Sequence, residues 1–565
     1  LVVRAKSGQT SSGHLVNNVS ITDLAGCTGT GDSRGQAFGI LLFDAAGEVS
    51  NSSVTGAGSG IAASNYTATP LLANIHHNSV VAVDVQAYTL TFNAAGTVFE
   101  RNLATYTDPT NNAIALLVDQ PQGFTIRNNL LTGARIGVFV GRQSGPQEQF
   151  VIGEGNRLVG PGAEVLSSFG VLADGSSFVW NVNSNFIIEK TLVTQFGKGI
   201  VLDRQDDTGF NNVTVRSNQL VNNDIGLFAG VGSNIDLHHN RLVGNSFAGV
   251  QSIQNLAVEN NWWGCNEGPG AAGCDGLLGP LDANPWLVLS ASAGETSLPP
   301  EGWTLVQSSL AFNSASQDTS AAGAVPDGIQ AAYSAPDGGS VAPLDGVSLG
   351  GSFSVFEFSA PVWDQAYRAC VDVDHALVCA NVSVENVHPQ AAADAYNGAE
   401  DTLLSVAAPG VLANDSDINQ DVLTAHLVED AAHGDVTLAA DGSFTYQAQA
   451  DWFGVDSFTY KASDGSLESQ TVTVELTLAP VNDAPVAQSQ SVSLAEDQPT
   501  SITLGASDVD GDALEWLVED PQHGSLSGTA PDLIYTPFLN YFGADSFTFK
   551  VNDGTLDSNQ GVVNL

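Results

Sequence analysis

An irregular repeat in the first 264 residues constrains the fold more than any other feature of this sequence. Its clearest copies are FTIRNNLLTGARIGVFVG, VTVRSNQLVNNDIGLFAG and IDLHHNRLVGNSFAGVQS, which return at intervals of about 21 to 35 residues. Aligned, the copies share one polar column: Asn78, Asn102, Asn129, Asn156, Thr191, Asn218, Asn240 and Asn261. Apolar residues stand three positions before this column, except at Gly153, and two positions after it. Alternation with a period of two, broken by turns, predicts short strands, so each copy forms one coil.

The pattern resembles the right-handed parallel β-helix repeats of pectate-lyase-like and related secreted bacterial proteins, over residues 1–285. The resemblance implies that the coils stack, with neighbouring strands about 4.8 Å apart. Each aligned column then becomes a ladder along the axis. We expect the polar column, including Asn129, Asn156, Asn218, Asn240 and Asn261, to stack its amides in a turn, which is a structural role.

One outward column supplies the best candidates for catalysis: Glu189, Arg216, His238 and Glu259. Polysaccharide-cleaving β-helices need carboxylates and a basic residue that converge in a cleft, because bond cleavage takes an acid and a base or nucleophile. The alternative is that acids and bases alternate along the column because opposite charges on adjacent strands stabilise a sheet. The sequence favours the alternative, so no catalytic centre is predicted.

A second outward column is apolar, and it includes Phe139, Leu172, Val201 and Phe228. Such a stripe is unusual for a sugar-binding cleft and indicates a surface that something covers. The sharper hypothesis is a protein interface. A covering loop or a flanking domain of the same chain is the alternative.

The tripeptide HHN occurs twice, at residues 76–78 and 238–240. Paired histidines suggest a transition metal. Strand alternation predicts that adjacent rings point to opposite faces and cannot hold one ion together. The chain also contains no Met and so lacks thioether ligands. No metal is therefore expected at either tripeptide.

The stretch NNWWGCNEGPGAAGCDG, residues 260–276, ends the repeat. Trp263 takes the inward position of the column and is expected to plug the last coil. A predicted disulfide between Cys265 and Cys274 closes a lid over it. Trp262 is expected to point outward, free to contact a partner. Cys370 and Cys379 bracket a hairpin and predict a cross-strand disulfide, whereas the state of Cys27 stays open.

Three further domains are expected, at residues 286–386, 387–482 and 483–565. The first resembles bacterial immunoglobulin-like domains. The other two form a direct repeat, with GAEDTLLSV matching LAEDQPTSI and DWFGVDSFTY matching NYFGADSFTF, and both resemble bacterial cadherin-like domains of immunoglobulin fold. The whole chain is therefore predicted to be all-β, a right-handed parallel β-helix followed by three β-sandwiches. The last copy ends within its final strand, so we expect either that the chain is one part of a longer tandem array or that a neighbouring molecule completes the last sheet.

The cadherin-like resemblance implies calcium, although a solvated Asx turn is the alternative. In SDVDGDAL, Asp508, Asp510 and Asp512 stand at alternate positions, and Glu496, Asp497 and Asp545 are possible contributors. The earlier copy offers Asp415, Asp417, Asn419 and Asp421. The linker PVNDAPV, with Asn482 and Asp483, resembles the joints between cadherin repeats.

The net charge and the cysteine spacing limit the classes of function that the chain can have. Sixteen Lys and Arg against 61 Asp and Glu give a net charge of −45, which repels nucleic acid and anionic membranes. No apolar run is long enough to cross a membrane. Closely spaced cysteine pairs favour an extracellular setting. The leading hypothesis is a non-enzymatic surface protein, an adhesin or a subunit of a filament, sheath or surface layer, that self-associates or binds other surface proteins. The other is a secreted protein that binds or cleaves polysaccharide.

Overall fold

The computed structural model describes residues 1–4, 11–21, 38–43, 45–55, 59–64, 72–81, 86–91, 96–106, 113–119, 123–141, 149–162, 168–174, 186–203, 212–230 and 235–565. Cys27 lies outside them. The described residues form strands and one short 3-10 helix, η1 (Gly410–Leu412), so the chain is all-β. They divide into two units, Leu1–Pro361 with Gln365–Val384, and Val362–Asp364 with Glu385–Leu565.

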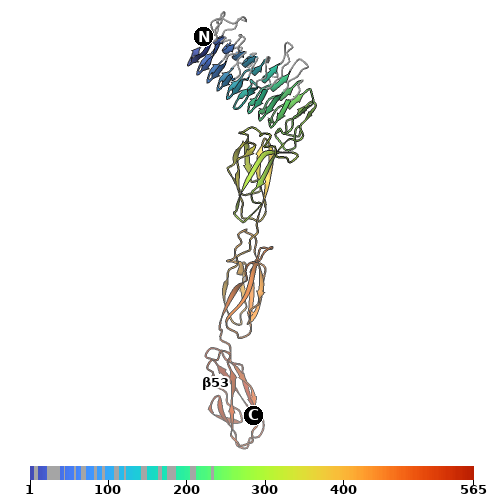
Figure 1. The fold of residues 1–565 in the computed structure, drawn as a ribbon. Coiled ribbons are helices and arrows are strands. Elements are labelled where there is room, and N and C mark those ends of the chain that lie inside the picture. Colours follow the sequence, from blue (N-terminus) through green and yellow to red (C-terminus); the bar gives the residue numbers. More distant parts are fainter. Residues whose placement is uncertain are drawn as a thin grey trace. The chain divides into compact units, whose positions relative to one another are not determined.

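The repeat forms a β-helix of three parallel sheets, seen in Figure 1 as the stacked blue to green arrows. The eleven-stranded sheet contains β1 (Val2–Arg4), β4 (Phe38–Phe43), β7 (Ser59–Ser64), β10 (Gln86–Thr91), β13 (Ile114–Asp119), β16 (Ile136–Val140), β19 (Phe169–Asp174), β22 (Lys198–Asp203), β25 (Ile225–Ala229), β28 (Ala248–Ser252) and β30 (Leu277–Leu278). The first nine-stranded sheet contains β2 (Ser11–Asn17), β5 (Ala45–Ser50), β8 (Ala73–His76), β11 (Val98–Glu100), β14 (Thr125–Arg127), β17 (Phe150–Ile152), β20 (Phe186–Glu189), β23 (Val213–Arg216) and β26 (Ile235–His238). The second contains β3 (Ser20–Ile21), β6 (Ser53–Thr55), β9 (Ser79–Val81), β12 (Leu103–Thr105), β15 (Leu130–Thr132), β18 (Arg157–Val159), β21 (Leu192–Thr194), β24 (Gln219–Val221) and β27 (Arg241–Val243).

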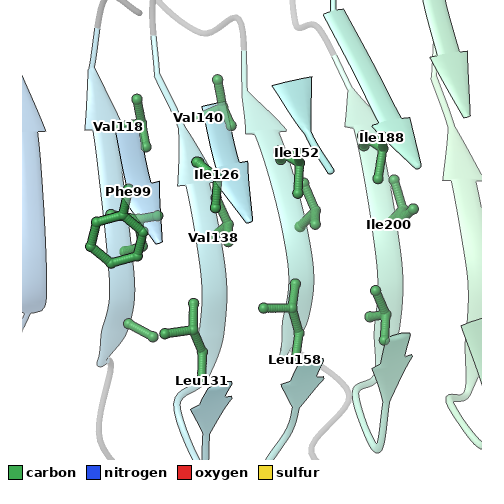
Figure 2. Close-up of a cluster of buried hydrophobic side chains, with 14 of the residues drawn as sticks. Phe99, Val118, Ile126, Leu131, Val138, Val140, Ile152, Leu158, Ile188 and Ile200 are labelled. Carbon is green, nitrogen blue, oxygen red and sulfur yellow. The ribbon is translucent and has the colours of Figure 1, made fainter. Parts of the chain in front are cut away.

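The core of the β-helix is a stack of apolar side chains, one layer for each coil. Figure 2 shows Phe99, Ile126, Ile152 and Ile188 following one another into the interior, with Leu131 and Leu158 facing them. These are the two apolar columns of the repeat. Because successive strand residues point to opposite faces, the same alternation that fills this interior sends the intervening residues outward.

Each coil turns between the two nine-stranded sheets at an Asn corner, which we define as the last strand residue, a left-handed residue and the ladder residue. The left-handed residue has a φ between 47° and 56° wherever it is not Gly, as at His77, Ser217 and His239. Behind it the ladder amides stack: Asn218 Nδ2 donates to Asn240 Oδ1 at 3.0 Å, and Asn240 Nδ2 donates to Asn261 Oδ1 at 3.0 Å. Each of these side chains is buried.

A second, shorter ladder runs through Asn223 and Asn245 to Asp275. Asn223 Nδ2 donates to Asn245 Oδ1 at 3.2 Å, and the backbone and side-chain nitrogens of Asn245 both donate to the Asp275 carboxylate. Asp275 is 6% exposed, and burial raises its pKa to about 6. The lid of the β-helix thus ends this ladder with a carboxylate.

The last coil joins the β-helix to the first sandwich. β29 (Leu256–Ala257) and β31 (Leu281–Asp282) pair below it, Trp263 lies in the interior, and a disulfide joins Cys265 to Cys274. Trp262 points outward as expected, but the prediction that it is free to contact a partner is wrong. It is fully buried in the core of the first sandwich, because that domain packs directly on the coil.

The first sandwich contains β32 (Leu287–Ala293), β33 (Ser297–Leu298), β34 (Trp303–Asn313), β35 (Gln330–Ser334), β36 (Ser340–Ala342), β37 (Asp345–Leu349), β38 (Ser352–Phe353), β39 (Phe356–Ser359), β40 (Ala366–Val373) and β41 (Ala376–Val384). A disulfide joins Cys370 on β40 to Cys379 on β41. Between them the hairpin tip presents Asp374, whose carboxylate accepts from Arg241 Nε at 2.8 Å and Trp262 Nε1 at 2.9 Å. The hairpin that this disulfide bridges therefore attaches the first sandwich to the β-helix.

The remaining two sandwiches share one plan. One contains β42 (Asp394–Ala399), β43 (Leu404–Val406), β44 (Thr424–Glu429), β45 (Gly434–Leu438), β46 (Phe444–Ala448), β47 (Gly454–Ser463) and β48 (Val472–Ala479). The other contains β49 (Val486–Gln488), β50 (Gln490–Ser491), β51 (Thr500–Thr503), β52 (Gly505–Ser507), β53 (Glu515–Val518), β54 (Gly524–Thr529), β55 (Asp532–Pro537), β56 (Ser546–Asn552) and β57 (Gly561–Asn564). In each, a four-stranded sheet faces a three-stranded sheet across a separate core.

Candidate functional site

Seven acidic residues gather at the joint between these two sandwiches, and we call them the acidic joint. They come from the turn after β42, the β46–β47 loop, the linker after β48 and the loop after β52. The side chains form three groups whose oxygens lie within 4.8 Å of one another: Glu400, Asp483 and Asp510; Asp401, Asp451 and Asp483; and Asp508, Asp510 and Asp512. Asp483 and Asp510 each belong to two groups, so the linker and the following loop hold the joint together.

Hydrogen bonds from the protein reach only some of the carboxylate oxygens in the acidic joint. Asp510 Oδ2 accepts from the backbone nitrogen of Asp483 at 2.7 Å, and the buried Glu400 accepts from that of Val481 at 2.8 Å. The Oδ2 atoms of Asp483 and Asp508 are buried and have no hydrogen-bond partner. Burial raises the pKa of Asp483, and Asp401, Asp451, Asp510 and Glu400 raise it further. Buried carboxylate oxygens beside like charges are costly alone and suit a calcium ion, which binds six to eight oxygens.

Three of the predicted calcium candidates, Asp508, Asp510 and Asp512, form one of these groups, whereas the predicted contributors Glu496, Asp497 and Asp545 belong to none of them. Asp545 instead accepts from Tyr535 Oη at 2.8 Å and His523 N at 3.0 Å inside its own domain. Glu496 and Asp497 also lie outside the three groups, and Asp497 accepts from the backbone of Asn540.

Their counterparts in the preceding copy, Glu400 and Asp401, are the residues that reach the joint. The signal that could have found them is the direct repeat, in which GAEDTLLSV aligns with LAEDQPTSI. The grouped carboxylates come from two successive domains, so the contributor is the earlier copy of the motif and not the one in the same domain.

The earlier candidates, Asp415, Asp417, Asn419 and Asp421, do not form one of the three-residue acidic groups found among the described residues. Asn419 is fully buried and caps the preceding linker: its Oδ1 accepts from Val387 N at 2.9 Å and its Nδ2 donates to Glu385 O at 3.1 Å. Asp415 accepts from Tyr460 Oη. Only Asp417 keeps a buried oxygen without a partner, so the fit to calcium is poorer here.

A cleft of about 840 Å³ lies between the Asn corners of three coils and the first sandwich. Its β-helix wall carries Glu154, Arg157, Glu189, Lys190 and Arg216, and its other wall is the 323–327 loop with Leu349 and Gly350. Arg216 pairs with Glu189 at 2.8 Å. Arg157 and Lys190 have no ion-pair partner among the described residues, which is notable in a chain with so few cations.

The four catalytic candidates are not all brought together. Glu189 and Arg216 line the cleft, whereas His238 and Glu259 do not. Glu189 and Arg216 form an ion pair, as Glu100 and Arg127 do at 2.6 Å on earlier coils. The structure therefore contains the charge alternation that favoured a structural interpretation. Glu154 belongs to the same outward column but was not chosen among the four candidates, because no pattern in the sequence singles out one coil among eight.

The apolar outward column is largely covered within the single chain. Val201 is 3% exposed, and Phe139 and Phe228 are half-buried, with Lys198 Nζ lying 4.1 Å from the centre of the Phe228 ring. The side chain of Leu172 lies outside the described residues. Among the described side chains of the column, Val201 is buried and the two phenylalanines are only partly exposed.

The prediction for the HHN tripeptides is wrong in its geometry. His238 Nδ1 lies 2.7 Å from His239 Nδ1, and His76 Nδ1 lies 2.8 Å from His77 Nδ1. Strand alternation does not apply, because the second histidine is the left-handed residue of the Asn corner and turns its ring back toward the first.

Comparison with known families identifies three segments. Residues 112–263 match the right-handed β-helix region, residues 386–480 match the bacterial cadherin-like domain, and residues 482–565 match the bacterial Ig domain. No curated protein matches the chain. In the part of the chain that the structure describes, no helix has the length and hydropathy of a membrane span.

Solved structures give only distant likenesses. An endo-fucoidan hydrolase of glycoside hydrolase family 107 shares 16% identity at a TM-score of 0.18, over 56% of each chain. Human CDH23 EC21-23 shares 15% identity at 0.28, over 48% of this chain and 96% of that one. Invasin, a bacterial integrin-binding protein, shares 14% at 0.23, over 49% and 60%. The chain thus spans little more than half of the hydrolase and three fifths of the invasin structure.

These domains, together with the two disulfides, fit an extracellular, adhesin-like protein. The chain thus combines a right-handed β-helix region with a bacterial cadherin-like domain and, at residues 482–565, where a second cadherin-like copy was predicted, a segment that matches the bacterial Ig domain.

Proposed function

We propose that this is a non-enzymatic surface protein, adhesive or structural, in which calcium stiffens the domains that carry the β-helix. The acidic joint carries the proposal. Asp483 and Asp510 are each shared by two acidic groups, and two buried oxygens have no protein donor. Asp483 from the linker, Glu400 and Asp401 from one domain, and Asp508, Asp510 and Asp512 from the next would hold the ion. Calcium there neutralises the repulsion and fixes the linker.

The test is calcium-dependent stability of the two cadherin-like domains in the full chain. For a site with a Kd of roughly 0.1–1 mM, typical of extracellular modules, 10 mM Ca²⁺ should stabilise the joint by about 1–3 kcal/mol. Asp510→Asn should abolish the effect, because it removes a ligand from two groups at once. Asp497→Asn, a change of equal charge outside the three groups, is the matched control. Equal calcium responses in both variants would contradict the proposal.

Adhesion or assembly is tested separately. Beads coated with the full chain should aggregate, or bind other surface proteins, in calcium and disperse in chelator. Electron microscopy of the native material should show ordered polymers if the protein is a filament, sheath or surface-layer subunit. Beads that stay dispersed and material that is monomeric throughout would argue against both forms of the hypothesis.

A second candidate is a protein that binds or cleaves an acidic polysaccharide, and the cleft favours it. Three of the sixteen cations of the chain, Arg157, Lys190 and Arg216, line it together with two carboxylates, Glu154 and Glu189. A carboxylate pair is the minimal equipment for glycosidic cleavage, and cations attract acidic sugars.

Incubation with acidic polysaccharides, scored for reducing ends and unsaturated products, separates the two candidates. Turnover lost in Glu154→Gln and Glu189→Gln would establish an enzyme. Retention of polysaccharide without turnover, weakened by Lys190→Ala, would establish a binding protein. If the protein shows neither turnover nor retention, only the first proposal remains.

A further inference from the structure

One outward column of the β-helix is covered at one end and open at the other. Its members pair in register on successive strands from β12 to β27: Leu103, Leu130, Arg157, Leu192, Gln219 and Arg241. The first sandwich meets the last two, because Gln219 Nε2 donates to Asp327 O at 3.3 Å and Arg241 pairs with Asp374. Leu130, by contrast, is 39% exposed, and Arg157 is exposed.

Two exposed cations, Arg101 and Lys190, flank the open part of this column. Each is the left-handed residue of an Asn corner, with a φ of 54° and 47°. Like Arg157, they have no ion-pair partner among the residues that the structure describes. The open surface thus combines uncompensated positive charge with leucine side chains. We call it the basic strip, and it consists of Arg101, Leu103, Leu130, Arg157, Lys190 and Leu192.

The charges of the chain are divided unevenly between its domains. Residues 1–285 contain thirteen of the sixteen Lys and Arg, whereas residues 387–565 contain two Lys and 28 Asp and Glu. A basic strip with leucines fits an acidic surface that has an apolar centre. The pair of Arg241 with Asp374 already joins this column to a sandwich carboxylate within one chain. The acidic domains of a second copy offer the same chemistry to the open part.

β53 presents a surface that matches the basic strip. It is the edge strand of a four-stranded sheet, labelled in Figure 1, and Glu515, Leu517 and Glu519 are exposed along it. Leu517 is 68% exposed, whereas the two residues between these three pack against the core of the domain. Lys550, across the sheet from Leu517, is paired with Asp557 at 3.9 Å. The outward face of β53 therefore reads acid, leucine, acid.

The two surfaces also agree in length. Arg101 and Lys190 stand on coils that are three strand spacings apart, which is about 14 Å along the axis. Glu515 and Glu519 are four residues apart in an extended strand, which is again about 14 Å. A strand laid along the β-helix axis would place its two carboxylates over the two cations and Leu517 near the middle of the strip.

We propose that β53 of a second copy docks along the basic strip, with Glu515 and Glu519 paired to Arg101 and Lys190 and with Leu517 against Leu130. The contact joins two different surfaces, so each copy offers its strip to one neighbour and its edge to another. Such a head-to-tail contact continues as a filament where its rotation does not close a ring. The inference names the partner in the structural form of the proposed function and rests on that form, but it does not require calcium.

The experiment measures self-association of the full chain by sedimentation velocity in a calcium-containing buffer. Arg101→Glu with Lys190→Glu reverses the strip, and Glu515→Lys with Glu519→Lys reverses the edge. Each double variant alone sets like charges against each other, so it should associate about 10- to 100-fold more weakly than the wild-type chain. An equimolar mixture of the two should restore association, because every strip then finds an edge of opposite charge.

Two matched controls carry the same changes of charge elsewhere. Lys198→Glu with Arg368→Glu alters cations outside the strip, and Glu429→Lys with Glu475→Lys alters exposed acids of the preceding domain. Both should associate as the wild-type chain does. Leu517→Gln should weaken association without any change of charge, and circular dichroism checks that each variant is folded.

The outcomes separate this contact from the proposed function. If the wild-type chain associates but the mixture stays as dissociated as its components, the contact is wrong and another mode of self-association operates. A wild-type chain that is monomeric throughout would overturn both the contact and the structural form of the proposed function. Retention of acidic polysaccharide by a monomeric protein, lost when the strip is reversed, would overturn the contact and assign the cations to the second candidate. The Asp510→Asn protein should still associate, so failure of the calcium site is distinguishable.

Discussion

Replacement of Asn218 by Ala tests the contribution of the ladder to stability. The side chain is fully buried; its Oδ1 accepts from Thr191 N at 3.1 Å, and its Nδ2 donates to Ile188 O at 2.8 Å and Asn240 Oδ1 at 3.0 Å. Alanine leaves the Thr191 N–H buried without an acceptor, which costs about 1–3 kcal/mol, and removes two bonds of about 1 kcal/mol each. We therefore expect the β-helix to lose about 3–5 kcal/mol.

The ladder itself supplies the matched control. Thr191 stands in the same column, and its hydroxyl donates to the carbonyl of Glu189 at 3.1 Å. Asn218→Thr should restore a donor but not the acceptor for Thr191 N, and so should cost about half as much. A variant that loses as much with Thr as with Ala would show that the bonds from Nδ2 contribute little.

Scanning calorimetry of the full chain measures the effect. The endotherm of the β-helix unit should shift to lower temperature in the order Asn218, Thr, Ala. The endotherm of the other unit, Val362–Asp364 with Glu385–Leu565, is an internal reference and should not move, because its cores are separate. A shift equivalent to less than about 1 kcal/mol for Ala would refute the reasoning that buried ladder amides carry an obligatory bond network.

Three other predictions concern the end of the β-helix. Trp262→Ala should destabilise the first sandwich by about 3–5 kcal/mol, because it opens a cavity in that core, and limited proteolysis should then cut between coil and sandwich. Asp374→Ala should cost a comparable amount, because it leaves the largely buried Arg241 guanidinium unpaired, and thermal unfolding measures it. Asp275→Asn should act oppositely: burial raises the pKa of Asp275 in the folded state from its ordinary 3.8 to about 6, so the folded state binds the proton more tightly and stability falls as pH rises from about 4 to about 6. The Asn variant should abolish that fall and gain up to about 3 kcal/mol at pH 7, as denaturation across this pH range would show.

The sequence allowed prediction of features that many coils repeat, and failed where a feature occurs once. The column that contains Asn218 could be recognised in the sequence because it recurs in eight coils. The ladder of Asn223, Asn245 and Asp275 was missed, because it spans few coils and ends in the lid as Asp. The alternation of side chains along the strand correctly predicted that Trp262 points away from the coil interior. It could not show that the first sandwich lies in that direction, so Trp262 was wrongly assigned to solvent.

Candidate sites depended on contacts between distant segments. Glu400 and Asp510 meet only when two domains are placed end to end, which periodicity within one domain cannot reveal. The rings of His238 and His239 come together because the backbone of His239 is left-handed, and the dipeptide HH alone does not predict this conformation. Sequence patterns therefore located the domains, while the chemistry of the sites followed from a few turns and joints.

At the Asn corner, neighbouring coils stay aligned although the number of residues in each coil varies. Successive ladder residues from Thr191 to Asn261 are 27, 22 and 21 positions apart in the chain, yet each donates its backbone N–H to the Oδ1 of the next. Insertions can accumulate at the other corners without disturbing this one. A β-helix of this kind can therefore lengthen or shorten by duplication or deletion of whole coils, so the length of its axis can change without redesign of its fold.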